Sequence, residues 1–315
     1  MARSILVRMI LPCLVALLIP AAAASSLAAQ MSWYALGYRA ESAGPYAVDL
    51  IHGLVYARRG RSVLRADVYR PFEASAPCPG VLLVHGGGWR HFDRTAAGGF
   101  ARLLATHGFL AATVDYRSSK KDPWPACLYD VKAAVRWLRA EAARFNMDPR
   151  RIGAVGDSAG GHLVALLGTA GPEAGLEGEA GDPAGDSAVQ AVVAYYGLFD
   201  LTAMPEISRR VGPIAGLLGA KYEERPELYR AASAISYVDR DDPPFLLVHG
   251  SSDRLVPAAQ SQLMANALEA AGVPVRLLLV DRADHMLVKR GGRPDPPLAE
   301  VDRQVVAFLK ERLGR

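Results

Sequence analysis

Six short apolar runs without polar alternation place the strongest limit on how this chain can fold. They cover residues 81–84, 109–114, 151–155, 189–196, 245–248 and 275–280. Unbroken apolar runs of this length are typical of strands that are buried on both faces, as in a parallel sheet. Helical patterns separate or follow them, at residues 130–144, 257–271 and 298–313. This alternation predicts an α/β fold with a doubly wound, mostly parallel sheet.

Two earlier strands and one insertion complete the expected architecture. Residues 58–70 are expected to form an antiparallel hairpin around the Arg59-Gly60 turn at the edge of the sheet, which gives eight strands in all. Residues 198–237 lie between two strands and are too many for a plain crossover, so they predict a small helical cap insertion. Residues 171–186, rich in Gly, Glu and Asp, predict a surface loop or a disordered segment.

The first residues differ in character from the rest of the chain. Arg3 and Arg8 precede an apolar stretch at 9–24, and small residues follow at 26–28. This order is typical of a secretory signal peptide, cut near Ala28. Two prolines interrupt the apolar stretch and argue against a spanning helix, although a retained membrane anchor is the alternative. We therefore expect a signal peptide at 1–28, a leader at 29–47, a single α/β domain at 48–315, and a secreted or periplasmic location.

Composition excludes some classes of partner. The chain has 315 residues, of which 51% are hydrophobic, enough for one large domain with a full core. Its formal net charge is only +4 and no block of like charges occurs, so we expect no nucleic-acid partner and no stable membrane insertion once the signal is cut. Beyond the signal, Cys78 and Cys127 are expected at opposite ends of the sheet, too far apart for a disulfide.

A serine enclosed by glycines follows the third apolar run. The stretch Gly156-Asp157-Ser158-Ala159-Gly160 lies between a predicted strand and an apolar, helix-like segment. Small residues at Gly156 and Gly160 leave room for a strand that reverses sharply into a helix, with the Ser158 hydroxyl exposed at the apex. The dipole of the following helix favours negative charge at that point. A tight turn without chemistry is the alternative interpretation of the five residues taken alone.

A serine hydroxyl needs a base to act as a nucleophile, and the base needs a carboxylate to orient it. In a sheet of this kind the order along the chain is serine, acid, histidine. His285 lies in the loop after the last strand, where the base belongs. Of the other downstream histidines, His162 is on the helix after the serine and is expected to pack, and His249 ends a strand.

The acid is expected in the loop before the base. Asp253 follows the run at 245–248 and is our candidate. Its alternative role is an acid near a helix N-terminus, and Asp200 is the rival candidate. Asp284 is adjacent to His285 in the sequence, which points the two side chains apart.

The first apolar run leads into His85-Gly86-Gly87-Gly88-Trp89. Consecutive glycines let the backbone turn its N–H groups toward a ligand, as an oxyanion hole requires. A phosphate-binding loop is the competing interpretation, but no Gly-Lys-Ser or Gly-Lys-Thr follows. His85 and His91 suggest a metal, yet the sequence shows no clustered ligands to complete a site, so none is expected.

Together these segments resemble the α/β-hydrolase superfamily, in particular the hormone-sensitive-lipase-like esterases and the bacterial feruloyl-esterase-like and acetylxylan-esterase-like proteins. The likeness rests on HGGGW at 85–89, DYR at 115–117, GDSAGGH at 156–162, DDPPFLLVHGSSDRLVP at 241–257 and ADH at 283–285. It implies Ser158 as nucleophile, Asp253 as acid and His285 as base, with the oxyanion N–H groups supplied by Gly87, Gly88 and Ala159. Asp284 departs from the pattern, in which a glycine is usual.

The expected function is an exported serine carboxylesterase that hydrolyses short-chain acyl or aryl esters. The acyl group is expected to be acetyl or feruloyl in type, polysaccharide-linked esters are included, and no cofactor is expected. The substrate is expected to contact Trp89, Tyr116 and Trp124, near the cap at 198–237. An arylformamidase-like amide hydrolase and a catalytically silent binding protein of the same fold are the alternatives.

Overall fold

A computed structural model describes residues 39–72, 76–178, 183–203 and 212–314. The expected signal peptide and most of the leader lie outside these residues. In the described part, none of the helices combines the length and the apolar character needed to cross a membrane.

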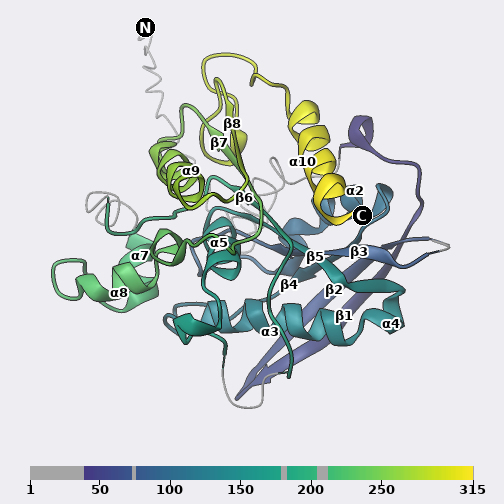
Figure 1. Cartoon of the computed structure of the whole chain (residues 1–315), viewed down its shortest axis with the longest axis horizontal. Coiled ribbons are helices and arrows are strands. Elements are labelled where there is room, and N and C mark those ends of the chain that lie inside the picture. The colour runs from purple at the N-terminus through teal and green to yellow at the C-terminus, as the bar shows by residue number, and fades with distance from the viewer. Residues whose placement is uncertain (1–38, 73–75, 179–182, 204–211, 315) are drawn as a thin grey trace, which may run out of the picture.

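The predicted α/β sheet is confirmed, with eight strands in the order β1-β2-β4-β3-β5-β6-β7-β8 (Figure 1). The pairs β1–β2 and β2–β4 are antiparallel and the other pairs are parallel. The strands are β1 Val48–Arg59, β2 Ser62–Pro71, β3 Cys78–Val84, β4 Leu110–Val114, β5 Met147–Asp157, β6 Ala191–Tyr195, β7 Phe245–Gly250 and β8 Val275–Val280. The edge hairpin is longer than the predicted 58–70. The prediction was too short because polar residues such as Asp49 and His52 interrupt the apolar positions of β1.

Helices cover both faces of the sheet. They are α2 Gly98–Thr106, α3 Ala126–Ala140, α4 Ala142–Phe145, α5 Ala159–Thr169, α7 Gly212–Leu218, α8 Pro226–Ala231, α9 Ala259–Ala271 and α10 Leu298–Leu313. Short 3-10 turns lie at η1 Ala40–Ser42, η2 Arg94–Ala97, η3 Pro172–Ala174, η4 Ala234–Tyr237 and η5 His285–Leu287. Within the predicted cap, α7, α8 and η4 are the expected short helices, and residues 204–211 lie outside the described part.

The core forms two layers because alternate residues of the central strands point to opposite faces. Val81 and Leu83 pack with α2 and α10, whereas Leu82 and Val84 pack with α3, α5 and α9. All four valine and leucine side chains are buried. This double burial explains why the strands read as continuous apolar runs in the sequence.

Two helices differ from the sequence expectation. The helix predicted at 130–144 begins earlier, at Ala126, and is interrupted after Ala140. Its expected first residue, Asp130, is fully buried and accepts hydrogen bonds from Arg117 instead of capping the helix. Helix α2 was not predicted, because it is short and opens with two glycines.

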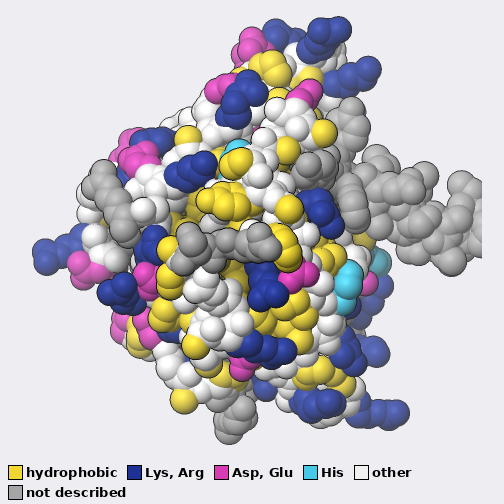
Figure 2. All heavy atoms as spheres, turned by 90° about the vertical axis from the view of Figure 1, so that its right-hand side faces the viewer, with side chains coloured by type: hydrophobic (Ala, Val, Ile, Leu, Met, Phe, Trp, Pro, Cys, Tyr) yellow, Lys and Arg dark blue, Asp and Glu magenta, His cyan; other side chains and the backbone are white. Residues whose placement is uncertain are grey.

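Cys78 and Cys127 are both buried and free, as expected from their separation. Burial raises the pKa of the Cys127 thiol to about 12, so it stays protonated near neutral pH. On the surface, Lys and Arg side chains are spread among hydrophobic and acidic ones on the face shown in Figure 2, without one dominant basic patch.

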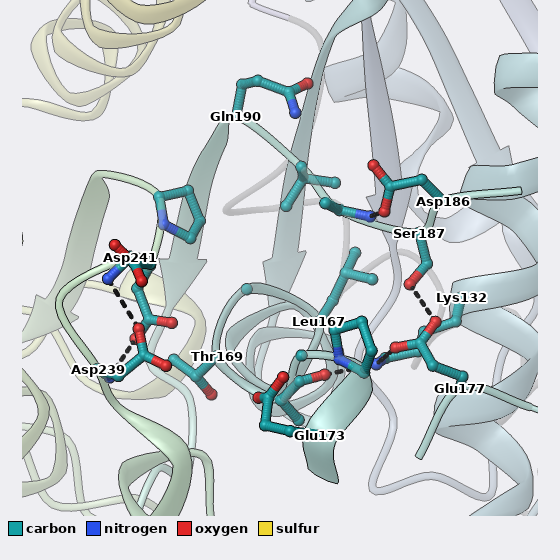
Figure 3. A pocket seen from close by; sticks show the side chains of 18 of the residues that line it. Lys132, Leu167, Thr169, Glu173, Glu177, Asp186, Ser187, Gln190, Asp239 and Asp241 are labelled. Carbon is teal, nitrogen blue, oxygen red and sulfur yellow. Dashed lines mark hydrogen bonds and ion pairs between the residues drawn. The ribbon is translucent and has the colours of Figure 1, made fainter. Parts of the chain in front are cut away.

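A cavity of about 610 Å³ lies at the amino-terminal ends of β6 and β7 (Figure 3). On one side the buried Lys132 donates to the carbonyl of Ala170 at 2.5 Å and forms an ion pair with Glu177. On the other side Asp242 lies close to Asp239, and burial raises the pKa of Asp242 from 3.8 to about 7, with the neighbouring carboxylates adding to the shift.

This pKa predicts a pH-dependent stability change. Since the Asp242 pKa is higher in the folded state, its contribution to stability is lost as pH rises from about 4 to about 7. Asp242→Asn should therefore raise the Tm at pH 8 and leave it nearly unchanged at pH 4, as measured by thermal unfolding. Asp241→Asn is the matched control, because the Asp241 side chain is 87% exposed; an equal gain from both variants would contradict the prediction.

Candidate active site

Ser158 occupies a sharp turn between the end of β5 and the start of α5. Its backbone has φ 52° and ψ −115°, a conformation that costs a residue with a side chain about 1–3 kcal/mol. A Cβ atom at Gly156 would lie 2.3 Å from the carbonyl oxygen of Gly160, and one at Gly160 would lie 2.0 Å from that of Val84. Both positions therefore require glycine, as the sequence indicated, and the turn presses against the end of β3.

Three side chains from separate loops meet at this turn. His285 Nε2 lies 3.0 Å from the Ser158 hydroxyl oxygen, and His285 Nδ1 lies 2.7 Å from Asp253 Oδ2. Asp253 follows β7 and His285 follows β8, so the parallel sheet brings them to the same edge. The Asp253 side chain is fully buried, whereas the His285 side chain is 11% exposed.

The hydrogen bonds of Asp253 define its charge. Its Oδ1 accepts from the backbone N–H groups of Leu255 and Val256, each at 2.9 Å. Burial alone would raise the Asp253 pKa, but hydrogen bonds from His249, His285 and Val256 hold it well below its usual value. An ionised carboxylate can only accept, so His285 Nδ1 carries the proton and Nε2 is free to accept the serine hydroxyl proton. The arrangement can therefore move a proton from Ser158 to His285.

The rival residues have other contacts. Asp200 accepts from Thr202 N at 2.8 Å and Thr202 Oγ1 at 2.7 Å, which stabilises a local turn. Asp284 accepts from the backbone N–H of His285 and pairs with Arg254, and its pKa is about 2, because these hydrogen bonds outweigh its desolvation. It thus fixes the loop that carries the imidazole.

His162 is buried, as its expected packing role requires. Its Nε2 donates to the carbonyl of Ala232 at 2.7 Å, and Trp89 Nε1 donates to its Nδ1 at 3.3 Å. Burial lowers the His162 pKa to about 4. The ring is therefore neutral near pH 7 and links the glycine loop to α5 and the cap.

The glycine loop lies beside the nucleophile turn. Gly86 N donates to Asp157 Oδ1 at 2.7 Å, and the next residues, Gly87 and Gly88, have φ of 107° and 59°. Within the described ranges, no hydrogen bond is found from the backbone N–H groups of Gly87, Gly88 or Ala159. These are the three groups expected to hold an oxyanion, and their assignment to that role stays a prediction.

The residues expected to contact substrate are mostly enclosed. Trp89 is 1% exposed and Tyr116 is 9% exposed, whereas Trp124 is partly buried. The Tyr116 hydroxyl donates to the carbonyl of His85 at 2.9 Å, and the two rings stack at 4.4 Å. Tyr116 thus packs against the glycine loop, of which Trp89 is the last residue. A contact to substrate remains a prediction for Trp89, Tyr116 and Trp124.

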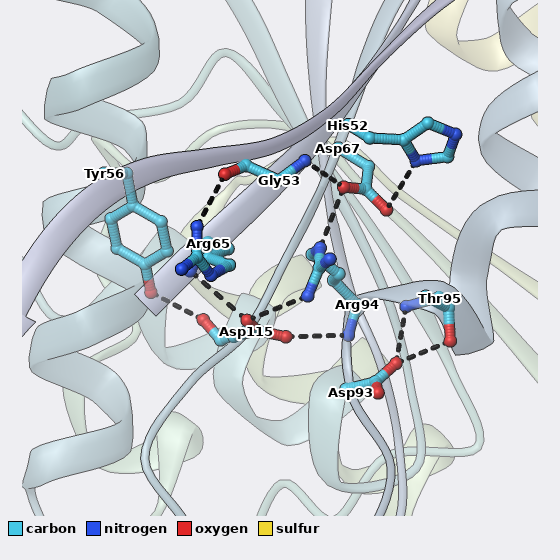
Figure 4. A network of polar contacts seen from close by, with 9 residues as sticks. All are labelled: His52, Gly53, Tyr56, Arg65, Asp67, Asp93, Arg94, Thr95 and Asp115. Carbon is cyan, nitrogen blue, oxygen red and sulfur yellow. Dashed lines mark hydrogen bonds and ion pairs between the residues drawn. The ribbon is translucent and has the colours of Figure 1, made fainter. Parts of the chain in front are cut away.

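A polar network not anticipated from the sequence holds the far end of this loop (Figure 4). Arg94 donates from Nε to the buried Asp67 at 2.8 Å and from its backbone N–H to Asp115 at 3.1 Å. Asp67 also accepts from Gly53 N at 2.7 Å, which ties the loop to the edge hairpin. The one sequence signal for this network was the position of Asp115 directly after a predicted strand. Polar residues at the carboxyl ends of strands in such sheets often lie in or near the binding site.

Among the described residues, no three His, Cys, Asp or Glu side chains are grouped so that they could hold a metal ion. The His85 ring, considered above as a possible ligand, instead has Nδ1 2.7 Å from the Gly86 carbonyl oxygen and stacks on Tyr116. Burial lowers its pKa.

A sheet of this order, with Ser158 at a sharp turn after β5 and with Asp253 and His285 after β7 and β8, defines an α/β-hydrolase. The chain belongs to the BD-FAE family, whose model matches residues 66–268.

Individual relatives agree with this family. Esterase LipQ of Mycobacterium tuberculosis is 36% identical over 222 residues, which cover 69% of this chain and 52% of the relative. The chain spans about half the length of the first curated relatives it matches. Among solved structures, a truncated carbohydrate esterase from gut microbiota has a TM-score of 0.71 and 26% identity, covering 89% of this chain and 100% of its own. An acetyl ester-xyloside bifunctional hydrolase from Caldicellulosiruptor lactoaceticus has a TM-score of 0.66 and 25% identity, covering 85% and 97%.

The packing of the serine turn yields a stability prediction. Gly160→Ala should destabilise the protein by about 1–3 kcal/mol or more, because its Cβ has no space against β3. Gly212→Ala is the control, since a Cβ there meets nothing within 4 Å. Thermal unfolding of both variants checks this, and equal Tm values would show that the turn can relax away from Val84.

Proposed function

We propose that this protein is a serine carboxylesterase that hydrolyses short-chain acyl or aryl esters. The observation that carries the proposal is the continuous hydrogen-bonded series from Ser158 through His285 to Asp253, beside three backbone N–H groups without a described partner. The similar proteins named above are esterases by description, which supports the reaction class. Because the three residues expected to form the triad lie in one hydrogen-bonded series, a catalytically silent binding protein is disfavoured.

In the proposed reaction, the Ser158 oxygen attacks the carbonyl carbon of the ester while His285 Nε2 takes the hydroxyl proton. The carbonyl electrons move to the oxygen, and the N–H groups of Gly87, Gly88 and Ala159 stabilise the resulting negative charge. When the tetrahedral intermediate collapses, the alcohol leaves with the proton held by His285. Water then attacks the acyl-enzyme and gives a proton to His285. When this second tetrahedral intermediate collapses, the bond between the acyl carbon and the Ser158 oxygen breaks, that oxygen takes the proton back from His285, and the carboxylic acid is released.

The features of the cap favour a substrate with a short acyl group. A Cβ at Gly88 would lie only 3.3 Å from the Pro213 side chain, so the start of α7 lies close against the glycine loop. Helices α7 and α8 have seven and six residues, too few for a long apolar lid of the kind that binds an oil surface. Carbohydrate esterases among the similar structures support an acetyl group on a sugar as the substrate, and aryl esters such as feruloyl are the second choice. A signal peptide at 1–28 would deliver the enzyme to such substrates outside the cytoplasm.

The triad assignment predicts a ranked series of variants. Ser158→Ala should lower kcat roughly 10⁴-fold with little change in substrate binding, because only the nucleophile is removed. Asp253→Asn should also cause a large loss, whereas Asp200→Asn should have little effect, since Asp200 stabilises a turn. Fluorophosphonate labelling followed by steady-state kinetics measures both. The assignment of the acid fails if the two aspartate variants rank in the opposite order.

Acyl length tests the substrate class. On p-nitrophenyl esters, kcat/KM should be highest for acetyl or other short groups and should fall beyond about eight carbons, because the short helices α7 and α8 offer no long apolar surface for the chain. Feruloyl and acetylated xylan substrates are compared at equal enzyme concentration. A maximum at twelve or more carbons with activation at an oil interface would indicate a lipase instead.

A further inference from the structure

The buried carboxylate of the acid is shared by two histidines. Asp253 Oδ2 lies 2.7 Å from His285 Nδ1 and 3.3 Å from His249 Nε2. His249 is the second-last residue of β7 and is fully buried. The other carboxylate oxygen, Oδ1, is already fixed by two backbone N–H groups. The orientation of Asp253 is therefore set by its own loop, and His249 acts on the oxygen that faces His285.

The contacts of His249 determine which nitrogen carries its proton. Nε2 lies 2.8 Å from the carbonyl oxygen of Val256, which can only accept, so Nε2 is an N–H donor. Nδ1 lies 2.7 Å from the hydroxyl oxygen of the buried Ser261 in α9, which donates to it. In this tautomer the N–H that is bonded to Val256 also lies near the carboxylate, with Nε2 3.3 Å from Asp253 Oδ2.

We propose that His249 is a positioning residue which, by donating to Asp253 Oδ2, reduces the negative charge that this oxygen presents to His285. The proposal rests on the function proposed above, in which His285 is the base. It gives a role to a histidine that takes no proton from the substrate and contacts none of the reacting atoms.

The consequence is a base that stays unprotonated to lower pH. A carboxylate oxygen that accepts a second hydrogen bond attracts a protonated imidazole less strongly. Other groups also face the two rings: Tyr196, at the end of β6, packs with a centroid distance of 4.7 Å to His285 and 6.5 Å to His249. Asp157, at the end of β5, interacts electrostatically with His285, and its own pKa is raised by burial to about 6. Asp284 is occupied by Arg254 and Arg290.

Different substitutions at His249 separate the effect of its Nε2–H donor from the effect of its side-chain volume. His249→Leu removes the donor and keeps a buried apolar side chain, whereas His249→Gln can place an amide N–H near the position of Nε2. His249→Met provides the same loss of the donor if the leucine variant does not fold. Ser261→Ala removes only the contact on the opposite side of the ring.

The measured quantity is the protonation midpoint of His285, followed by NMR of its imidazole Cε1–H in the full-length protein and assigned with His285→Gln. This signal is distinct from the titration of Asp157, which overlaps with any kinetic pH profile. The acid limb of kcat/KM for an acetyl ester is recorded in parallel.

Loss of the donor in His249→Leu or His249→Met should raise the His285 midpoint by about 0.5–1 pH unit. His249→Gln should restore most of the original value, and Ser261→Ala should shift it less than the leucine variant. The kinetic acid limb should move with the NMR midpoint while kcat well above the midpoint changes little.

An unchanged midpoint in the leucine and methionine variants, or a glutamine variant that behaves like them, would overturn the role of His249. A wild-type protein that hydrolyses no ester would overturn the proposed function instead, and the NMR titration would still measure the effect of His249 on His285.

Discussion

The close contact between the serine turn and the end of β3 is the constraint on which the rest of the site depends. Gly160 rests against the Val84 carbonyl, and Asp157 accepts the N–H of Gly86 just beyond it. These two contacts fix the distance between the nucleophile and the glycine loop. Any side chain at Gly160 would separate them. The packing of two neighbouring parallel strands thus holds Ser158 in its strained conformation, with the residue only partly buried.

Two buried aspartates near the serine differ because their hydrogen bonds differ. Asp253 accepts from two backbone N–H groups and lies within hydrogen-bonding distance of two histidines, and its pKa is low despite burial. Asp157 accepts from Gly86 N, and burial raises its pKa to about 6. Asp253 is therefore ionised near neutral pH, whereas Asp157 changes charge close to neutrality. The environment of each side chain, and not its residue type, thus sets the pKa values of these two carboxylates apart.

The sequence predicted the features that depend on local pattern or on the order of strands. Ser158, Asp253 and His285 could be chosen because each lies in the turn or loop after a predicted strand and the carboxyl ends of parallel strands share one edge. Contacts between elements could not be predicted. Arg94 in η2 pairs with Asp67 in β2, and His249 lies near Asp253 because the loop after β7 folds back toward its own strand. Helix α2 was missed because it has only nine residues and opens with two glycines, which leaves too little periodicity to recognise.

The position of β8 gives the site an unequal resistance to partial unfolding. Among the described residues this strand is the last in the sheet and pairs only with β7, whereas β5, which precedes the serine, is flanked on both sides. Because His285 follows β8, detachment of that edge would move the His285 ring away from Ser158, while β5 keeps its neighbours on both sides. A molecule with a frayed C-terminal edge therefore retains most of its core but has no proton acceptor at the serine. Loss of the Ser158–His285 hydrogen bond would thus report the opening of this edge of the sheet.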